Sequence, residues 1–312
     1  MPTVKGALRR VRGAPAPTPG GQGWRGLSPL SAQQVLDVVY ELILGREPDP
    51  TGTASYLSGL ANGSLTPQQV ANWAVASGEW WSVTPFPGLG QSLHFSRMMF
   101  VRSLPAGKRI LDLGGTALGN PTGALVLMGY PYRFDDLVVI DLPSEERNEL
   151  YREDTAHAVT TTALGPVRYR YHSMVDLSDF PDDSVDLVYS GQSIEHVPLE
   201  VADVVLSEVH RVLKPGGHLG LDTPNARVTR LQQADFIDPD HEYEYTHTEL
   251  SGKLERAGFE IVEAKGLNYA GPSVAAGRFD AEAVASARGI FSDLEDCYLL
   301  AYLCRVPPER RP

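Results

Sequence analysis

The sequence predicts an α/β protein, with a doubly wound, mostly parallel seven-stranded sheet, one antiparallel edge strand and a small all-α domain in front of it. Two observations carry this prediction. From residue 92 onward, short apolar runs of strand length alternate with helical patterns, which is typical of a parallel sheet covered by helices on both faces. Before residue 83, apolar residues recur at helical spacing. With 312 residues, 42% of them hydrophobic, the chain can bury one large core and one small one.

Residues 1–28 are rich in proline and glycine, show no periodicity and are predicted to be a disordered basic tail. The tail lacks the apolar stretch of a secretory signal, and no apolar run is long enough to span a membrane. Only two cysteines are present, so we expect a cytoplasmic protein without a disulfide framework or a cysteine-rich metal site. The net charge is −12 at pH 7 although the tail is basic. So acidic a body would repel a phosphate backbone, which argues against a nucleic-acid substrate.

Residues 29–82 are predicted to form the small all-α domain. Ser31 can cap a first helix, which Gly45 ends. A second helix is expected over residues 51–63 and a third from Thr66, with proline at its first helical position. The segment LGREPDPTG and the residues around it resemble a small bacterial helical domain of unknown function, often attached to surface-associated or glycan-handling proteins. We expect a platform that packs or pairs subunits into a homodimer, with no catalytic role.

Residues 83–312 carry the sheet. A helix over residues 92–104 leads into it. The seven strands are predicted over residues 109–114, 136–142, 167–173, 185–190, 217–223, 259–266 and 296–307. The last two strands form a hairpin-like pair, which places the one antiparallel strand at an edge of the sheet.

A glycine-containing turn follows the first of these strands. Asp112 ends the strand, Gly114, Gly115 and Thr116 follow it, and Gly119 comes shortly before a helix. Glycine lets the backbone approach a ligand closely because it has no Cβ. A turn of this kind is common, so it indicates a ligand site only together with other signals.

Three further signals follow in the order of the strands. Asp141 ends the second strand, where a carboxylate can accept hydrogen bonds from both ribose hydroxyls of a nucleoside; the alternative is a helix cap or turn residue. Asp176 follows the third strand, where it could meet the exocyclic amine of adenine. Residues 193–197, SIEHV, lie at the carboxyl end of the fourth strand, the edge at which open α/β sheets bind ligands. Residues 214–217, KPGG, close a helix and lead into the fifth strand.

Together, the segments DLGG, DDSVDLVYSGQSIEHV and VLKPGGHL resemble the class I, Rossmann-like methyltransferases that use S-adenosylmethionine. The resemblance covers residues 92–310. It implies that Gly114 and its neighbours contact the methionine part of the cofactor, Asp141 the ribose, and Asp176 with Leu177 the adenine. The full set of cofactor residues that it implies is Asp112, Gly114, Gly115, Thr116, Gly119, Asp141, Leu142, Asp176, Leu177, Ser190 and Gln192.

The glycine loop departs from the family pattern D-x-G-x-G-x-G. Thr116 and Leu118 occupy the second and third glycine positions, and Gly119 comes one residue late. The departure puts the path of the loop over residues 115–120 in doubt.

The reaction is displacement of a methyl group from a sulfonium by a nucleophile, and an alcohol needs a base to remove its proton. His196 is the first candidate for that base, with Glu195 orienting it or replacing it. His241 is the second candidate and lies in the acidic, aromatic insert over residues 234–247. The alternatives are an interior histidine that hydrogen-bonds the backbone for His196 and a solvated loop histidine for His241. His247 is expected at a helix N-terminus.

The same insert offers candidate acceptor contacts and a candidate ion site. The side chains expected to wall the acceptor pocket are those of Glu242, Tyr243, Tyr245 and Tyr269. No metal is predicted; the alternative is Mg²⁺ at Asp240, His241 and Glu242, within an acidic cluster that also contains Asp235 and Asp238. Solvated acidic loops are the commoner reason for such a cluster.

These observations predict S-adenosylmethionine-dependent O-methylation of a hydroxyl on a small molecule or glycan, a sugar in particular, with His196 or His241 or both as general base. One alternative is N- or C-methylation in natural-product biosynthesis. A nicotinamide-dependent dehydrogenase would also use Asp141, but no G-x-G-x-x-G follows the first strand. The remaining alternative is a binding protein without catalysis.

Overall fold

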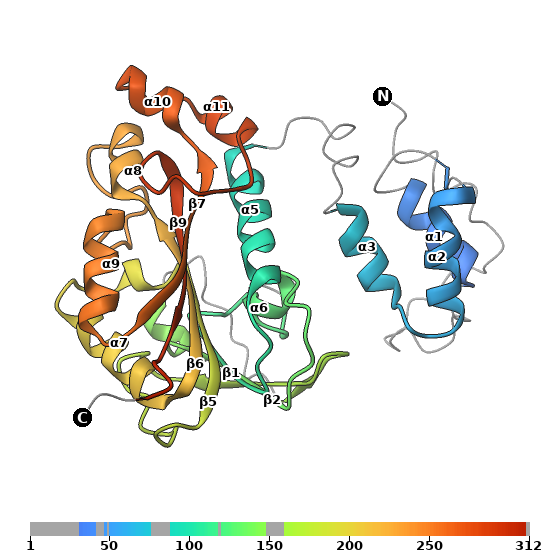
Figure 1. Cartoon of the computed structure of the whole chain (residues 1–312), viewed down its shortest axis with the longest axis horizontal. Helices are drawn as coiled ribbons and strands as arrows, with labels where there is room; N and C mark the ends of the chain where they lie inside the picture. The colour runs from blue at the N-terminus through green and yellow to red at the C-terminus, as the bar shows by residue number, and fades with distance from the viewer. Residues whose placement is uncertain are drawn as a thin grey trace. The chain divides into compact units, whose positions relative to one another are not determined.

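A computed structural model describes residues 31–41, 47–48, 50–75, 88–117, 120–147 and 159–309 (Figure 1). The chain divides into two compact units, Met1–Val83 and Thr84–Pro312. Among the described residues, no helix is both long and apolar enough to cross a membrane. The expected basic tail over residues 1–28 and the expected helix end at Gly45 lie outside the described residues.

The described residues of the first unit contain three helices: α1 (Ala32–Val39), α2 (Pro50–Ala61) and α3 (Pro67–Val75). The Ser31 hydroxyl caps α1 in a capping box with Gln34. Thr66 and Gln69 exchange the equivalent bonds at the start of α3. The side chains of Val35, Leu36, Val39, Tyr40, Val70 and Ala74 form a small core of their own.

The second unit is built on one nine-stranded sheet with the order β3-β4-β2-β1-β5-β6-β9-β7-β8. The strands are β1 (Arg109–Leu113), β2 (Asp136–Asp141), β3 (Thr160–Thr161), β4 (Pro166–Tyr171), β5 (Val185–Gly191), β6 (Leu213–Pro224), β7 (Glu260–Tyr269), β8 (Ile290–Phe291) and β9 (Cys297–Arg305). The central strands β4, β2, β1, β5 and β6 pair in parallel. The mostly parallel α/β sheet is thus confirmed.

Two details of the predicted sheet are wrong. The structure has nine strands rather than seven, because β3 and β8 add short antiparallel pairings at the two edges. Each spans two residues, which is too short to show a hydrophobic period in the sequence. The long antiparallel strand is also not at an edge, since β9 pairs with β6 on one side and β7 on the other. Its almost continuous burial agrees with an interior position.

Helices cover both faces of the sheet (Figure 1). On one face α7 (Val201–Val212) and α9 (His247–Arg256) pack through apolar side chains such as Leu206 and Leu250. On the other face α5 (Leu89–Ser103) and α6 (Ala124–Leu127) do the same through Phe100 and Leu125. The described part of this unit also contains α8 (Ala226–Gln232), α10 (Gly271–Ala276), α11 (Ala281–Ser286) and the 3₁₀ turns η3 (Ser144–Glu146) and η5 (Ile194–His196).

Candidate active site

The glycine turn after β1 is packed so tightly that side chains are excluded at two positions. Gly114 has a φ of +68°, and a Cβ there would lie 2.7 Å from the Cβ of Ser193. A Cβ on Gly115 would lie 2.2 Å from the carboxyl carbon of Asp112. Gly114 therefore lies close to Ser193, in the segment that follows β5. The carboxyl ends of β1 and β5 therefore form one continuous surface.

A third glycine of this turn was missed by the sequence reasoning. Gly119, the residue proposed for the role, lies outside the described residues. Gly123 has a φ of +78°, and a Cβ there would lie 2.7 Å from a methyl group of Val139 on β2. It precedes α6 and lets that helix start close to the sheet, which is the use of the third glycine in dinucleotide folds. Its signal was present as a glycine immediately before the apolar run ALVL.

The side chain of Asp112 stabilises the glycine turn. This side chain is buried, and its Oδ2 accepts a hydrogen bond of 2.9 Å from the backbone N–H of Leu125 at the start of α6. Its Oδ1 has no hydrogen-bond partner among the described residues. Burial raises the pKa of this carboxyl to about 7. Asp112 was expected to bind the cofactor; in the structure its buried carboxyl group joins the glycine turn to the start of α6.

Asp141 lies at the end of β2 beside the same turn. Its Oδ2 accepts from the backbone N–H of Thr116 at 3.2 Å, and its Oδ1 accepts from that of Leu142 at 2.8 Å. The Nε of Arg147 lies 3.6 Å from Oδ1. The hydroxyl of Thr116 is buried and makes no hydrogen bond within the described part of the chain. Asp141, Thr116 and Leu142, three of the residues expected to bind the cofactor, therefore lie together at the end of β2.

The two residues expected around adenine are directed differently. Asp176 is exposed, and its carboxylate accepts from the backbone N–H of Ser178 at 3.0 Å. Hydrogen bonds with Ser178 hold the pKa of Asp176 below its usual value. The side chain of Leu177 is fully buried in the core beneath α7. It therefore does not line an open cleft, because an apolar side chain at this turn is drawn into the core rather than toward solvent.

A charged cluster lies beside Gln192 at the carboxyl ends of β5 and β6. The fully buried carboxylate of Asp222 accepts from Arg97 Nε at 2.6 Å, from the Tyr189 hydroxyl at 2.5 Å and from Gln192 Nε2 at 2.9 Å. Ser190, the other residue expected here, shares a hydrogen bond of 2.6 Å with the hydroxyl of Ser193. The sequence reasoning missed Arg97 and Asp222, which lie 125 residues apart and gave no local signal.

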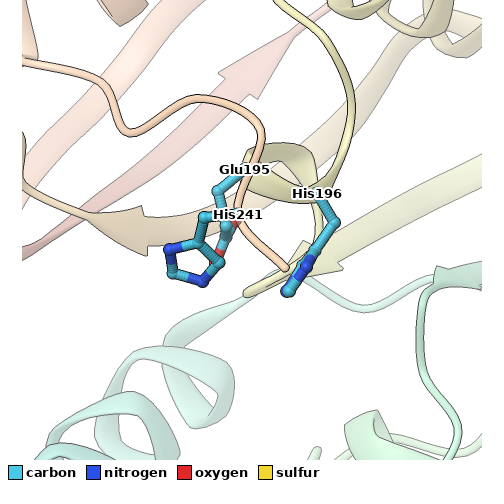
Figure 2. A group of neighbouring side chains, drawn as sticks. All are labelled: Glu195, His196 and His241. Carbon is cyan, nitrogen blue, oxygen red and sulfur yellow. The ribbon is translucent and has the colours of Figure 1, made fainter. Parts of the chain in front are cut away.

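The three predicted catalytic side chains converge (Figure 2). Glu195 and His196 belong to η5, and His241 comes from the loop after α8. That loop is attached to η5 because the backbone N–H groups of Glu242 and Tyr243 donate to the carbonyl of Glu195 at 2.8 and 3.0 Å. One carboxylate oxygen and one nitrogen of each ring all lie within 4.8 Å of one another. The two imidazole rings meet edge to face, with centroids 4.8 Å apart.

Hydrogen bonds determine which nitrogen of each imidazole ring carries the proton. His196 Nδ1 lies 3.1 Å from the backbone carbonyl of Asp240, which only accepts, so Nδ1 carries the proton and Nε2 keeps its lone pair. His241 Nδ1 lies 2.7 Å from the buried carboxylate of Glu244 and donates to it in the same way. Both rings therefore leave Nε2 for another partner.

The pKa values of the three groups move in different directions. Desolvation of the ring, followed by the neighbouring His241, lowers the pKa of His196 and keeps it neutral at pH 7. Burial alone would lower the pKa of His241, but the hydrogen bond to Glu244 and the charge of Glu195 outweigh it and raise the pKa. Burial raises the pKa of Glu195 to about 7. Such perturbed groups in contact are typical of functional sites.

The expected acceptor residues are placed less uniformly. Glu242 is exposed. Tyr243 and Tyr245 line a cavity of about 510 Å³ together with residues of α7 and α9, and His241 is not part of its lining. Tyr269, at the end of β7, packs against Phe291 with ring centroids 5.8 Å apart. Tyr243 thus meets the catalytic cluster through its backbone N–H, which donates to the carbonyl of Glu195, while its side chain lines the cavity.

The alternative magnesium set is also rearranged. Asp240 contributes its backbone carbonyl to His196, and the Glu242 side chain is exposed. Within the described part of the chain, the donor atoms that come together are those of Glu195, His196 and His241. The first two of these were named as catalytic residues rather than as ligands.

Part of the second unit is similar to known proteins. Residues 111–221 match the family model described as a methyltransferase domain. A "probable S-adenosylmethionine-dependent methyltransferase" of Mycolicibacterium smegmatis is 40% identical over 102 residues, which are 32% of this chain and 38% of that protein. A sterol 24-C-methyltransferase of Yarrowia lipolytica is 29% identical over 43% of this chain and 36% of its own length. A ubiquinone biosynthesis O-methyltransferase of Xanthomonas axonopodis is 27% identical over 64% of this chain and 84% of its own length.

The chain spans well under half the length of the first two relatives. The matched segment begins within β1 and ends within β6, so it contains the glycine turn, Asp141 and the Glu195–His196 turn. Residues 111–221 are therefore similar to a methyltransferase domain, and the relatives named above are S-adenosylmethionine-dependent, sterol and ubiquinone methyltransferases by their descriptions.

Proposed function

We propose that the chain is an O-methyltransferase that transfers the methyl group of S-adenosylmethionine to a hydroxyl of a small molecule or glycan, in particular a sugar. The observation that carries the proposal is the pair of histidines, His196 and His241, whose Nδ1 atoms are occupied and whose Nε2 atoms are left to accept a proton. An acceptor hydroxyl needs such a base, whereas a neutral amine does not.

The residues around the glycine turn suit the cofactor. Gly114 and Gly115 allow close approach to the backbone, and Asp141 suits the ribose hydroxyls. The Arg97 guanidinium, held by Asp222, supplies a positive charge that suits the carboxylate of the methionine part. When bound, S-adenosylmethionine supplies an activated methyl group on a sulfonium, so the protein's main tasks are alignment and proton removal.

His196 is the group best prepared to take the proton. Its lowered pKa keeps the ring neutral at pH 7, and its exposed edge is open to an acceptor. His241 is held by Glu244 and packs edge to face against the His196 ring. A positioned base of this kind contributes about 10²–10⁴-fold to the rate.

The charge of the loop after α8 supports an uncharged, hydroxyl-rich acceptor. Residues 233–246 contain five acidic and three aromatic side chains and neither lysine nor arginine, which disfavours a phosphorylated acceptor. The likeness of the N-terminal segment to a domain found beside glycan-handling proteins supports a saccharide by analogy only. Relatives that methylate oxygen or carbon are both known, so C- or N-methylation is the second candidate.

The test is a transfer assay with labelled cofactor on a panel of saccharides, small alcohols, amines and carboxylates. We expect label on a saccharide hydroxyl; transfer only to amines or carboxylates would refute the proposal. His196→Ala and His241→Ala should each lower kcat by about 10²-fold or more while S-adenosylhomocysteine binds as before. His218→Ala removes a histidine from β6, outside the cluster, and should leave kcat unchanged. Full activity in both cluster variants would exclude the histidines as bases.

Calorimetric titration with S-adenosylhomocysteine and with NADH separates the remaining functions. Binding of the first and not of the second is expected. The reverse result indicates a dehydrogenase, and binding of neither indicates a protein that has lost its cofactor.

A further inference from the structure

We propose that Glu195, His196 and His241 form a binding site for one divalent transition-metal ion, such as Zn²⁺, Mn²⁺ or Co²⁺. The site would hold the acceptor hydroxyl and make it acidic. This inference deepens the proposed O-methylation and rests on it for its chemical role, whereas the binding of the ion can be measured without any acceptor.

Glu195 has one carboxylate oxygen that makes no hydrogen bond among the described residues. Glu195 is fully buried, and its Oε2 accepts a hydrogen bond of 3.0 Å from the Thr223 hydroxyl. Its Oε1 is buried and has no hydrogen-bond partner among the described residues. A buried carboxylate oxygen without a partner is costly, so it indicates a missing donor or cation.

Both histidines are held by hydrogen bonds from their Nδ1 atoms. In metal sites, a ligating histidine nearly always donates its other ring N–H to a carboxylate or to a backbone carbonyl. His241 donates Nδ1–H to Glu244, and His196 donates Nδ1–H to the carbonyl of Asp240. The cluster thus contains one outer partner of each kind, and both Nε2 atoms remain as ligands.

The outer partner of His241 is itself fixed. The carboxylate of Glu244 accepts hydrogen bonds from the Thr229 hydroxyl and from the backbone N–H of Ile237 in addition to that of His241. Glu244 is 1% exposed. Glu244 is therefore held by three hydrogen bonds, and it in turn sets the orientation of the His241 ring. A solvent-exposed loop histidine would not need such an arrangement.

The donor set points to the class of ion. Two imidazole nitrogens and one carboxylate oxygen suit zinc, manganese, cobalt or iron, whereas Mg²⁺ prefers oxygen ligands alone. Ligands about 2.1 Å from one ion lie roughly 3.0–3.4 Å apart, so the three atoms, now within 4.8 Å, would have to close by about 1.5 Å. Three protein ligands leave at least one position for an acceptor oxygen.

The chemistry balances without an oxidant or reductant. The acceptor hydroxyl binds to the ion and loses its proton to water, because a divalent cation lowers the pKa of a bound O–H. The resulting alkoxide oxygen forms a bond to the methyl carbon as the carbon–sulfur bond breaks. The products are a methyl ether and S-adenosylhomocysteine. In this arrangement the ion takes over the activation of the hydroxyl that is assigned above to the histidines, and the two rings act as its ligands.

The test measures metal binding to the full-length protein after it has been stripped with a chelator and dialysed. Co²⁺ is added without cofactor or acceptor, and its visible absorption bands report nitrogen coordination. We expect one Co²⁺ per chain, displaced by one Zn²⁺. Glu195→Gln and His241→Ala should each weaken binding by at least about 10-fold, and Glu244→Gln, which removes only the outer partner, by about 10–100-fold.

Glu242→Gln is the matched control, because it removes the same charge from the same loop but from an exposed side chain. It should leave Co²⁺ affinity unchanged. Circular dichroism of each variant shows that it is folded. Absence of nitrogen-coordinated Co²⁺, or equal affinity in the wild type and all three site variants, overturns the proposal. Weakening by Glu242→Gln but not by Glu195→Gln also overturns it and moves the ion to the exposed loop.

Activity after stripping separates this proposal from the proposed function. Loss of hydroxyl methylation that Zn²⁺ or Mn²⁺ restores supports both. Full methylation by the stripped protein overturns the role of the ion and keeps the O-methyltransferase with histidine bases. Tight Co²⁺ binding with no methylation of any hydroxyl supports the metal site and refutes O-methylation.

Discussion

Replacing Asp112 with asparagine should stabilise the protein above neutral pH. The Asp112 side chain is 1% exposed, and burial raises its pKa from 3.8 to about 7. A carboxyl whose pKa is higher in the folded state favours folding when protonated. Its contribution is therefore fully present below pH 3.8 and is lost as the pH rises to about 7. Asparagine does not titrate and can still accept the hydrogen bond from Leu125.

The size of the effect follows from the two pKa values. Each pH unit between them is worth about 1.36 kcal/mol, so ionisation of Asp112 costs the folded protein at most about 4 kcal/mol. Between about pH 5 and pH 8.5, the advantage of Asp112→Asn over wild type should grow by up to about 3 kcal/mol. The assay is urea unfolding at these two pH values, followed by far-ultraviolet circular dichroism.

The comparison of variant with wild type isolates Asp112 from other titrating groups, Glu195 among them. Asp176→Asn is the control, because the exposed Asp176 has a lowered pKa and stays ionised at both pH values. Its difference from wild type should therefore be the same at both. If the Asp112→Asn difference is also independent of pH, the carboxyl titrates normally and the reasoning from its burial is wrong.

Three further outcomes test the packing around the site. Gly123→Ala should lower the free energy of unfolding in urea by about 2 kcal/mol or more, because position 123 combines a positive φ with a steric overlap. Gly277→Ala is the control, because Gly277 has a positive φ but open space around it, and it should cost less. Equal losses in the two variants would exclude the overlap as a cause. Tyr245→Phe should leave the free energy of unfolding unchanged or raise it, because the Tyr245 hydroxyl is buried without a partner in the described structure. A decrease of more than about 1 kcal/mol would show that the hydroxyl has a hydrogen-bond partner. Asp222→Asn should lower the free energy of unfolding by about 3–5 kcal/mol, because Arg97, whose side chain is only 15% exposed, loses its buried counter-charge. A loss below about 1 kcal/mol would show that the pair is effectively solvated.

The sequence was enough to predict the strands that position the site, because each is a short apolar run between turn residues. It did not place β9 between β6 and β7. A continuous apolar run shows that a strand is buried on both faces but not which strands it pairs with. The direction of β9 was expected correctly, and its place in the order was not.

The candidate site shows a similar division. Glu195 and His196 were found because they follow a strand directly, and His241 because it stands out in an acidic loop. Arg97 and Asp222 were missed because they lie 125 residues apart and only folding brings them together. Glu244 was missed although His241 lies only three residues away, because the sequence of an acidic loop does not show which carboxylate is buried. A charge on a helix or strand has no local pattern that distinguishes a buried pair from a solvated one.

The carboxyl end of the sheet collects negative charge that the protein itself only partly balances. Asp112, Glu195, Asp222 and Glu244 are all at least 99% buried there. Asp222 has Arg97, and Glu244 has three donors, whereas Asp112 and Glu195 each keep an oxygen without a partner in the described structure. Burying carboxylates costs free energy unless cations or donors accompany them. A sulfonium and a divalent ion both bring positive charge, so either of the two proposed ligands would lower the cost of burying these carboxylates.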